Sequence, residues 1–341
     1  MNNFWKDNMI GINAVITGVS GYVPDYILTN DELSRMVDTN DEWIVSRTGI
    51  KERRILVEEG LGTSFMARKA ASMLIKKTNV DPQSIDAVIV GTCTADFCFP
   101  STSSIVVGKL GLNNAYAFDL SGACSGFLYS LETASMMIKS GRYRKIIVIG
   151  ADKMSSLIDY KDRQTCALFG DGAGAVLLEA TGEENIGLID SHLRTDGKGL
   201  PFLHVKSGGS VCPSNQFSVD NRLHYLYQEG QAVFRNAVSA MSEDCSLIAE
   251  RNGLNITNIR FIVPHQANIR IIEAIARRMD IPMQKFMVNL EHFGNTSAAT
   301  IPLALWEYEH LLRKGDNLIL TAFGAGFTHG ASYYKWNYDG K

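Results

Sequence analysis

Three side chains suited to acyl-transfer chemistry stand at the ends of predicted strands. Cys124 lies in DLSGACSGF, His265 in VPHQAN and Asn295 in HFGNTSAA. Each stretch joins a strand pattern to a helical pattern, and side chains at such strand ends line the crevice of an α/β sheet. If they converge, a thiolate can take up an acyl group while an imidazole and a carboxamide donate hydrogen bonds to a developing oxyanion.

Taken singly, each of the three residues also has a structural explanation. Cys124 precedes an apolar helix that Gly141 closes, and backbone N–H groups at a helix N-terminus favour a thiolate. A small cysteine used for packing fits the same pattern. His265 alone could be a junction residue and Asn295 alone a helix cap. The combination is therefore what indicates catalysis.

The elements that position these residues occur twice. A strand, a glycine-bearing turn, an apolar helix, a glycine and an apolar strand follow one another over residues 115–150 and again over 286–322, where Phe286–Asn289 is the first strand. The repeat predicts two similar halves, residues 1–181 and 182–341. Cys124 and Asn295 would then occupy related turns at helix mouths that face one another.

Composition narrows the class of protein. The 341 residues are 45% hydrophobic with a net charge of -3 and no block of like charges, so neither a nucleic acid nor a membrane is expected as the main partner. No apolar run has the length of a membrane span, and residues 1–11 lack a signal-peptide pattern, which predicts the cytoplasm. Six scattered cysteines form no CxxC pair, so we expect free thiols and no metal site.

Two further segments leave alternatives open. Asp41–Arg54, DEWIVSRTGIKERR, is either a surface loop anchored by Trp43 or an aromatic and cationic platform for a nucleotide. Phe169–Gly174, FGDGAG, lacks the lysine and hydroxyl residue of a P-loop and indicates a tight turn. The turn Phe323–Phe327, FGAGF, would offer backbone N–H groups to an oxyanion.

With these motifs in order, the chain closely resembles β-ketoacyl-acyl-carrier-protein synthase III, within the thiolase-fold superfamily. The resemblance runs from about Ile12 to Tyr334 and rests on DEWIVSRTGIKER, FPS, GACSGF, FGDGAGA, VPHQANIRI, HFGNTSAA and FGAGFTHG. It implies a duplicated five-layered αβαβα fold, an acyltransferase of fatty-acid biosynthesis and a homodimer.

The resemblance also implies a two-stage condensation without a metal or other cofactor. Cys124 would take an acyl group from a short acyl-CoA primer, with acetyl-CoA expected. Malonyl-acyl carrier protein would then lose CO2, and a neutral His265 Nε2–H and the amide of Asn295 would stabilise the enolate. Backbone N–H groups of Cys124 and Ala325 would hold the thioester oxyanion. The product is a 3-oxoacyl-acyl carrier protein.

Matching positions imply a CoA site. Trp43 and Arg163 would sandwich the adenine, Arg47 and Arg270 would meet phosphates, and Asn268 would lie near the pantetheine arm. Because these side chains come from distant parts of the sequence, the fold has to assemble the site.

The same matching implies contacts to proteins and marks departures from the family. Gln266 and Arg270 would bind the carrier protein, and Phe99 would reach across the dimer to the partner's acyl pocket. His329 stands where the family commonly has an aromatic residue, usually Trp. Leu200–Gln228 is longer than the family norm, which leaves the primer's length and branching open.

Two other functions fit part of the pattern. A related Cys-His-Asn condensing enzyme or acyltransferase of secondary metabolism would keep the same three residues and use another acyl-CoA. An acyl hydrolase, or a non-catalytic subunit of a heterodimer, would share the fold. The intact set of Cys124, His265 and Asn295 speaks against an inactive subunit.

Overall fold

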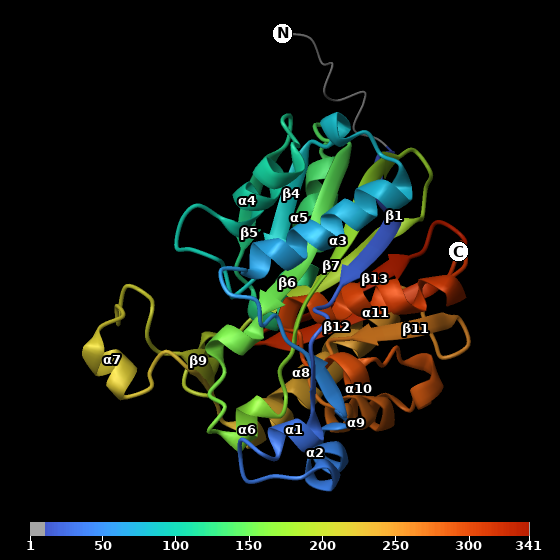
Figure 1. Ribbon diagram of the computed structural model, residues 1–341. Coiled ribbons are helices and arrows are strands. Elements are labelled where there is room, and N and C mark those ends of the chain that lie inside the picture. Colours follow the sequence, from blue (N-terminus) through green and yellow to red (C-terminus); the bar gives the residue numbers. More distant parts are fainter. Residues whose placement is uncertain (1–10, 341) are drawn as a thin grey trace.

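Two β-sheets organise the chain (Figure 1), and the computed structural model describes residues 11–340. The N-terminal segment weighed above for signal character lies, up to Ile10, outside the described residues. The first sheet has the order β1(Asn13–Tyr22), β7(Asp171–Thr181), β6(Lys145–Lys153), β4(Ala87–Gly91), β5(Tyr116–Leu120). The second has the order β11(Ile259–Pro264), β12(Asn317–Gly324), β13(Thr328–Lys335), β8(Gly187–Thr195). Two small ribbons pair β2(Ile27–Thr29) with β3(Glu52–Arg54) and β9(Leu203–Val205) with β10(Leu226–Gln228).

Helices complete five layers, as the resemblance implies. The outer face of the first sheet carries α3(Thr63–Thr78) and α4(Thr102–Leu110). Between the sheets lie α5(Gly126–Lys139) and α11(Thr300–Tyr308). The second sheet is covered by α8(Gly230–Arg251) and α9(Ile269–Met279). The short helices are α1(Asn30–Leu33), α2(Asp41–Thr48), α6(Arg163–Cys166), α7(Gln216–Asp220) and α10(Leu290–Phe293).

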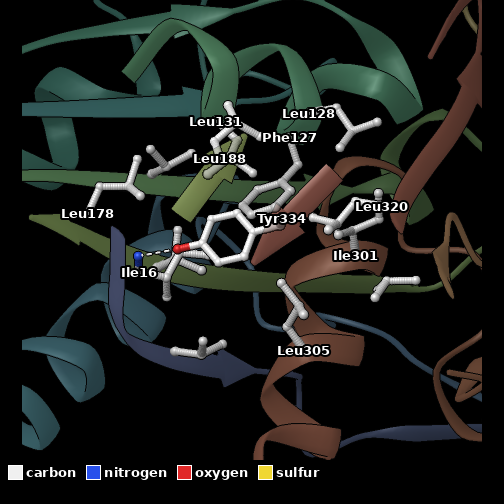
Figure 2. Packing of buried hydrophobic residues seen from close by; sticks show 14 of the residues in the cluster. Ile16, Phe127, Leu128, Leu131, Leu178, Leu188, Ile301, Leu305, Leu320 and Tyr334 are labelled. Carbon is white, nitrogen blue, oxygen red and sulfur yellow. Dashed lines mark hydrogen bonds between the residues drawn. The ribbon is translucent and has the colours of Figure 1, made fainter. Parts of the chain in front are cut away.

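The largest hydrophobic cluster fills the space between the sheets and explains why both sheets have apolar strands. Leu178 of the first sheet and Leu320 of the second contribute to it together with Phe127 of α5. At its centre Tyr334 accepts a hydrogen bond from the backbone N–H of Ile16 (Figure 2). Strands covered on both faces need apolar side chains at every position, as in the fully buried run of β4.

The two sheets repeat one topology, which agrees with the duplication in the sequence. In the first sheet parallel β4 and β6 are followed by antiparallel β7 and β1. In the second, parallel β11 and β12 are followed by antiparallel β13 and β8. Helix α5 precedes β6 in the chain, and α11 precedes β12, the strand at the matching position of the second sheet. The turns before these two helices pack against each other, so the expected meeting of the helix mouths is present.

The expected strand over Phe286–Asn289 is wrong. The segment makes only an isolated bridge, between Phe286 and Ile262, at the edge where β5 stands in the other sheet. The reason is the buried side chain of Gln266, whose amide donates to Met287 O at 3.0 Å and accepts from the Asn289 N–H at 3.2 Å. A side chain thus takes up the backbone groups that a strand neighbour would otherwise bind.

The interpretation of residues 41–54 as a loop is also corrected, because Asp41–Thr48 is the helix α2. Asn40 caps its first turn by accepting from the Trp43 N–H at 2.8 Å, and Gly49 ends it at a φ of 78°. Residues 52–54 form β3. Trp43 therefore stands on a capped helix, which fixes its position better than a loop would.

The long segment Leu200–Gln228 forms a small ribbon and an arm. Strands β9 and β10 lie at its two ends, and α7 extends away from the layered body at the tip (Figure 1). Phe217 on α7 is exposed, as is Val211 before it. The ribbon contributes to the cavity described next.

Candidate active site

One cavity of about 1170 Å³ contains all three residues proposed for catalysis, Cys124, His265 and Asn295. It extends from these half-buried and buried side chains to exposed arginines. Its other walls include the predicted substrate-binding residues Trp43, Arg47, Arg163, Asn268 and Arg270, and Ala325 of the glycine-rich turn. The fold thus brings together residues from six separate parts of the sequence.

Cys124 occupies a tight turn at the mouth of α5. The preceding Ala123 has a φ of 47°, which places the 3₁₀ turn Ala123–Ser125 between β5 and the helix. Thr328 at the start of β13 accepts from Ser125 Oγ through its carbonyl at 3.1 Å and donates its hydroxyl to Gly122 O at 2.9 Å. These two bonds lock the cysteine turn to the second sheet.

The ionisation of Cys124 differs from the sequence-based expectation. A helix mouth favours a thiolate, but burial raises the pKa of Cys124 to about 12, against a lowering contribution from Ser297. The nearby Asp152 carboxylate raises the pKa further. In the free protein the residue is therefore a thiol, and the expected thiolate is wrong for that state.

His265 follows the last residue of β11 and is buried. Its backbone N–H donates to Thr321 O at 2.8 Å, and its Nδ1 lies 2.8 Å from the hydroxyl of Thr300 on α11. Burial lowers the pKa of His265 to about 3, so the ring is neutral at physiological pH. A neutral ring in the cavity suits hydrogen bonding to an anion without an added positive charge.

Asn295 stands in the turn before α11 with its orientation fixed. Its side-chain oxygen accepts from the Ser297 N–H at 2.8 Å, while its backbone pairs with Leu168 and Gly170. Because the oxygen is occupied, the amide NH2 is the group that remains for a ligand. The predicted role of Asn295 as a hydrogen-bond donor is compatible with this geometry.

The glycine-rich turn lies against the cysteine. Gly324 approaches so closely that a Cβ on it would be 2.7 Å from Cys124 N, and Ala325 and Gly326 line the cavity. Only a residue without a side chain allows this approach. The backbone of Ala325 is thus near the Cys124 thiol. When this sulfur attacks a thioester, the carbonyl oxygen of the thioester would develop negative charge close to that backbone.

Trp43 is covered by two arginines rather than standing open. The guanidinium carbon of Arg47 lies 5.1 Å from the ring centroid and that of Arg163 lies 5.3 Å from it. A base stacked between Trp43 and Arg163 would need about 7 Å, two contact distances of ~3.5 Å. A guanidinium nitrogen of Arg163 donates a hydrogen bond to Asp38 O at 3.2 Å. Arg163 would have to move outward to admit an adenine.

The expected phosphate and pantetheine contacts lie beside α9. Asn268 caps α9 by accepting from the Arg270 N–H at 2.8 Å, and both residues line the cavity. The guanidinium of Arg270 is exposed above Phe234. An anionic ligand at this helix N-terminus would meet both the arginine and the helix dipole.

Two other predicted contact residues lie outside this cavity. Gln266 is fully buried and its amide donates to backbone carbonyls, so its side chain has a structural role, and the carrier-protein contact at this position stays a prediction. Phe99 lies in the loop before α4 with 86% of its surface exposed. Such exposure is compatible with a contact to a second chain.

The two departures noted in the sequence have defined places. Leu203 and Leu226 of the ribbon line the cavity, so the long segment forms part of the wall. His329 does not line the cavity. Its Nδ1 lies 2.6 Å from Asp244 of α8, which joins β13 to the outer helix layer.

Sequence reasoning missed Ser297, Cys93 and Asp152 near the thiol. Ser297 lines the cavity and lies 3.7 Å from the sulfur of Cys93, a second thiol in the same wall. The buried Asp152 accepts from Cys93 N at 2.8 Å and from Ala298 N at 3.1 Å, and so joins two loops of the site. Ser297 could have been found from its place in the repeat, whereas the other two follow from the fold alone.

Two negative findings concern the described part of the chain. Residues 11–340 contain no group of three or more His, Cys, Asp or Glu side chains arranged to hold a metal ion. Among their helices, none has the length and apolar character needed to cross a bilayer.

Comparison with known proteins gives consistent matches. The family model described as 3-oxoacyl-[acyl-carrier-protein] synthase III matches residues 118–197, and the model of its C-terminal part matches residues 249–336. The chain is 66% identical over 330 residues to beta-ketoacyl-[acyl-carrier-protein] synthase III 2 of Bacteroides thetaiotaomicron, covering 97% of this chain and 98% of that one. It is 65% identical over 329 residues to the synthase III of Phocaeicola vulgatus, covering 96% and 98%.

A solved structure gives the same result for the fold. The crystal structure of 3-oxoacyl-[acyl-carrier-protein] synthase III from Aquifex aeolicus is 40% identical and superposes with a TM-score of 0.86, covering 95% of this chain and all of that one. The predicted thiolase-like α/β fold is confirmed. The resemblance stated from the motifs is confirmed as well.

Proposed function

Since the chain belongs to the 3-oxoacyl-[acyl-carrier-protein] synthase III family, we propose that Cys124, His265 and Asn295 carry out its condensation of an acyl primer with malonyl-acyl carrier protein. The chain is an acyltransferase of fatty-acid biosynthesis. The observation that carries the residue roles is the single cavity that joins the three side chains to a basic, aromatic substrate entrance.

In the first stage the sulfur of Cys124 attacks the thioester carbon of the primer. A new carbon–sulfur bond forms, the bond to CoA breaks, and the thiol proton ends on the departing CoA sulfur. Since desolvation raises the pKa of the half-buried Cys124 thiol, ionisation has to be coupled to substrate binding. The backbone N–H groups of Cys124 and Ala325 stabilise the oxyanion.

In the second stage the malonyl group loses CO2 and becomes an enolate. The Nε2–H of His265 and the amide N–H of Asn295 hold the enolate oxygen, while its carbon attacks the acyl group on Cys124. The sulfur leaves and recovers a proton, and the 3-oxoacyl-carrier product departs. Neutral donors suit this stage because they stabilise the enolate without protonating its carbon.

The substrate entrance binds CoA first and the carrier afterwards. Trp43 and Arg163 enclose the adenine after Arg163 moves outward, Arg47 and Arg270 hold the phosphates, and Asn268 contacts the pantetheine arm. Arg270, exposed at the edge of the cavity, also meets the acidic carrier protein. The reaction requires neither a metal nor a separate cofactor.

The functional form is a cytoplasmic homodimer in which the exposed Phe99 of each chain closes the partner's acyl pocket. Within each chain the half at residues 1–181 supplies the nucleophile, and the half at 182–341 supplies His265 and Asn295. Analytical ultracentrifugation at micromolar concentration tests the dimer, and a chain that stays monomeric at all concentrations argues against it.

The function is tested by incubating the protein with malonyl-acyl carrier protein and a panel of acyl-CoAs, and identifying the 3-oxoacyl-carrier product by mass spectrometry. We expect product from short primers, with acetyl-CoA most effective. A preference for aromatic or long acyl-CoAs would instead place the chain in secondary metabolism. Failure to condense any primer would contradict the proposal.

A further inference from the structure

His265 has one side-chain hydrogen-bond partner among the described residues, the hydroxyl of Thr300. The two atoms, Nδ1 and Oγ1, are 2.8 Å apart. Both residues are buried, with 3% of His265 and 2% of Thr300 exposed, so bulk water does not serve this nitrogen. Thr300 is the first residue of α11 and lies on the side of the ring away from Nε2.

The side of the ring that carries the proton determines what His265 offers to the cavity. A neutral imidazole has one N–H, and burial keeps this ring neutral by lowering its pKa to about 3. If Nδ1 holds the proton, Nε2 can only accept a hydrogen bond. If Nδ1 accepts one, Nε2 carries the N–H and can donate to an enolate oxygen.

The hydroxyl of Thr300 has two acceptors within reach, the His265 ring and its own turn. Its oxygen lies 3.0 Å from Ser297 O and 2.8 Å from His265 Nδ1. The Ser297 carbonyl already accepts the backbone N–H of Thr300, whereas Nδ1 has no second partner among the described residues. A buried acceptor without a donor is costly, so when Nδ1 is unprotonated the hydroxyl proton has to go to Nδ1, and Ser297 O then keeps the backbone N–H of Thr300 as its donor.

We propose that Thr300 is a positioning residue that donates its hydroxyl proton to His265 Nδ1 and thereby holds the ring as the Nε2–H tautomer. This tautomer presents a neutral donor to the cavity. Its catalytic consequence rests on the proposed function, since only the enolate stage uses the His265 donor. Thr300 therefore acts on condensation and not on the loading of Cys124.

The primary test is 15N NMR of protein labelled at histidine nitrogens, where protonated and unprotonated ring nitrogens resonate far apart. The His265→Gln variant identifies the signal of His265 among the seven histidines. We expect Nε2 protonated and Nδ1 unprotonated and hydrogen-bonded. A ring protonated on Nδ1 overturns the proposal, and this result requires no variant of Thr300.

The second test compares Thr300→Val, which removes the hydroxyl, with Thr300→Ser, which keeps it. We expect Thr300→Val to slow the discharge of acyl-Cys124 by malonyl-acyl carrier protein by roughly 10²-fold, while acyl loading changes by less than about threefold. Thr300→Ser should restore discharge and the wild-type 15N signals. Equal slowing of both stages, or no slowing of discharge, contradicts the proposal.

The two tests separate this inference from the proposed function. A wild-type chain that carries the Nε2–H tautomer but condenses no primer would keep the role of Thr300 and refute the proposed reaction. A chain that condenses normally with Nδ1 protonated would keep the proposed reaction and refute the role of Thr300. Should Thr300→Val fail to fold, the wild-type spectrum still decides, because a ring protonated on Nδ1 overturns the proposal without any variant of Thr300.

Discussion

The turn before α5 and the turn before α11 have the same backbone conformation but different side chains. Ala123 and Ser297 each stand three residues before the first residue of their helix, with φ values of 47° and 53°. Both begin a 3₁₀ turn, and the two turns pack against each other between the sheets. The positive φ is uncommon for residues other than glycine, so its occurrence at both matched positions reflects one duplicated shape.

Side chains make the difference between the two turns. The position after Ala123 is the thiol Cys124, while the position after Ser297 is Ala298, which contributes a backbone N–H to Asp152 at 3.1 Å. The second turn instead presents Asn295 and orients it through the Ser297 N–H. We infer that duplication supplied one geometry twice, and that the two copies now serve successive stages of one reaction.

Removal of the nucleophile should give the largest effect. In Cys124→Ala we expect no acyl adduct from any acyl-CoA and a loss of condensation of more than about 10⁴-fold. Intact-protein mass spectrometry measures the adduct. The matched variant Cys93→Ala removes the other thiol of the cavity and should still take up the acyl group. If the adduct is lost in Cys93→Ala and kept in Cys124→Ala, the nucleophile is Cys93 and our assignment is wrong.

Removal of the amide in the second turn should separate the two stages. We expect Asn295→Ala to form the acyl-enzyme within a few-fold of the normal rate and to discharge it about 10²- to 10³-fold more slowly, because one oxyanion donor is lost. Asn295→Asp tests whether the lost hydrogen-bond donor is the cause, because an ionised carboxylate cannot donate and should also slow discharge. Rapid-quench measurement of each stage decides, and a defect confined to loading would contradict the division between the turns.

The packing of the second turn against β6 can be disturbed without changing a functional group. A Cβ on Gly150 of β6 would lie 2.2 Å from Ala298 O, so Gly150→Ala has to displace the second turn. We expect a loss of about 2 kcal/mol or more in unfolding free energy, and a larger loss of condensation than of loading. The control Gly182→Ala, which meets no atom within 4 Å, should unfold like the wild type in urea at equal protein concentration.

The ionisation of the thiol gives a pH-dependent prediction. With a pKa of about 12, Cys124 is increasingly deprotonated as pH rises, and below that pKa the thiolate fraction grows about tenfold per pH unit. Iodoacetamide alkylation of Cys124, followed by peptide mass spectrometry, should therefore accelerate about tenfold per unit from pH 7 to 10 without a plateau. A plateau below pH 9 would show a thiolate favoured by the helix mouth after all.

Much of the fold was accessible from local patterns. The first copy of the predicted repeat, residues 115–150, corresponds to β5, α5 and most of β6, and the second copy, residues 286–322, contains α11 and most of β12. Periodicity works here because each element buries one face or both against a neighbour. The helix α2 was missed although Asn40 and Gly49 carried its capping signals, because the polar composition of the segment was given more weight.

The meeting of the three side chains proposed for catalysis was also predictable, because strand ends and the repeat place them on one crevice. Their ionisation was not. The pKa of Cys124 depends on burial by segments far away in the sequence, and no local pattern reports it. The same holds for Gln266, whose neighbours in the sequence suggest a binding residue, while its amide replaces a missing strand contact.

The measurement that tests the central claim most directly is intact-protein mass spectrometry of the wild type with a panel of acyl-CoAs, before and after malonyl-acyl carrier protein is added. Our account predicts that a short acyl group loads on Cys124, remains there without the carrier, and leaves as 3-oxoacyl-carrier product once the carrier is present. An adduct that never forms, or that hydrolyses at the same rate with and without the carrier, would contradict it.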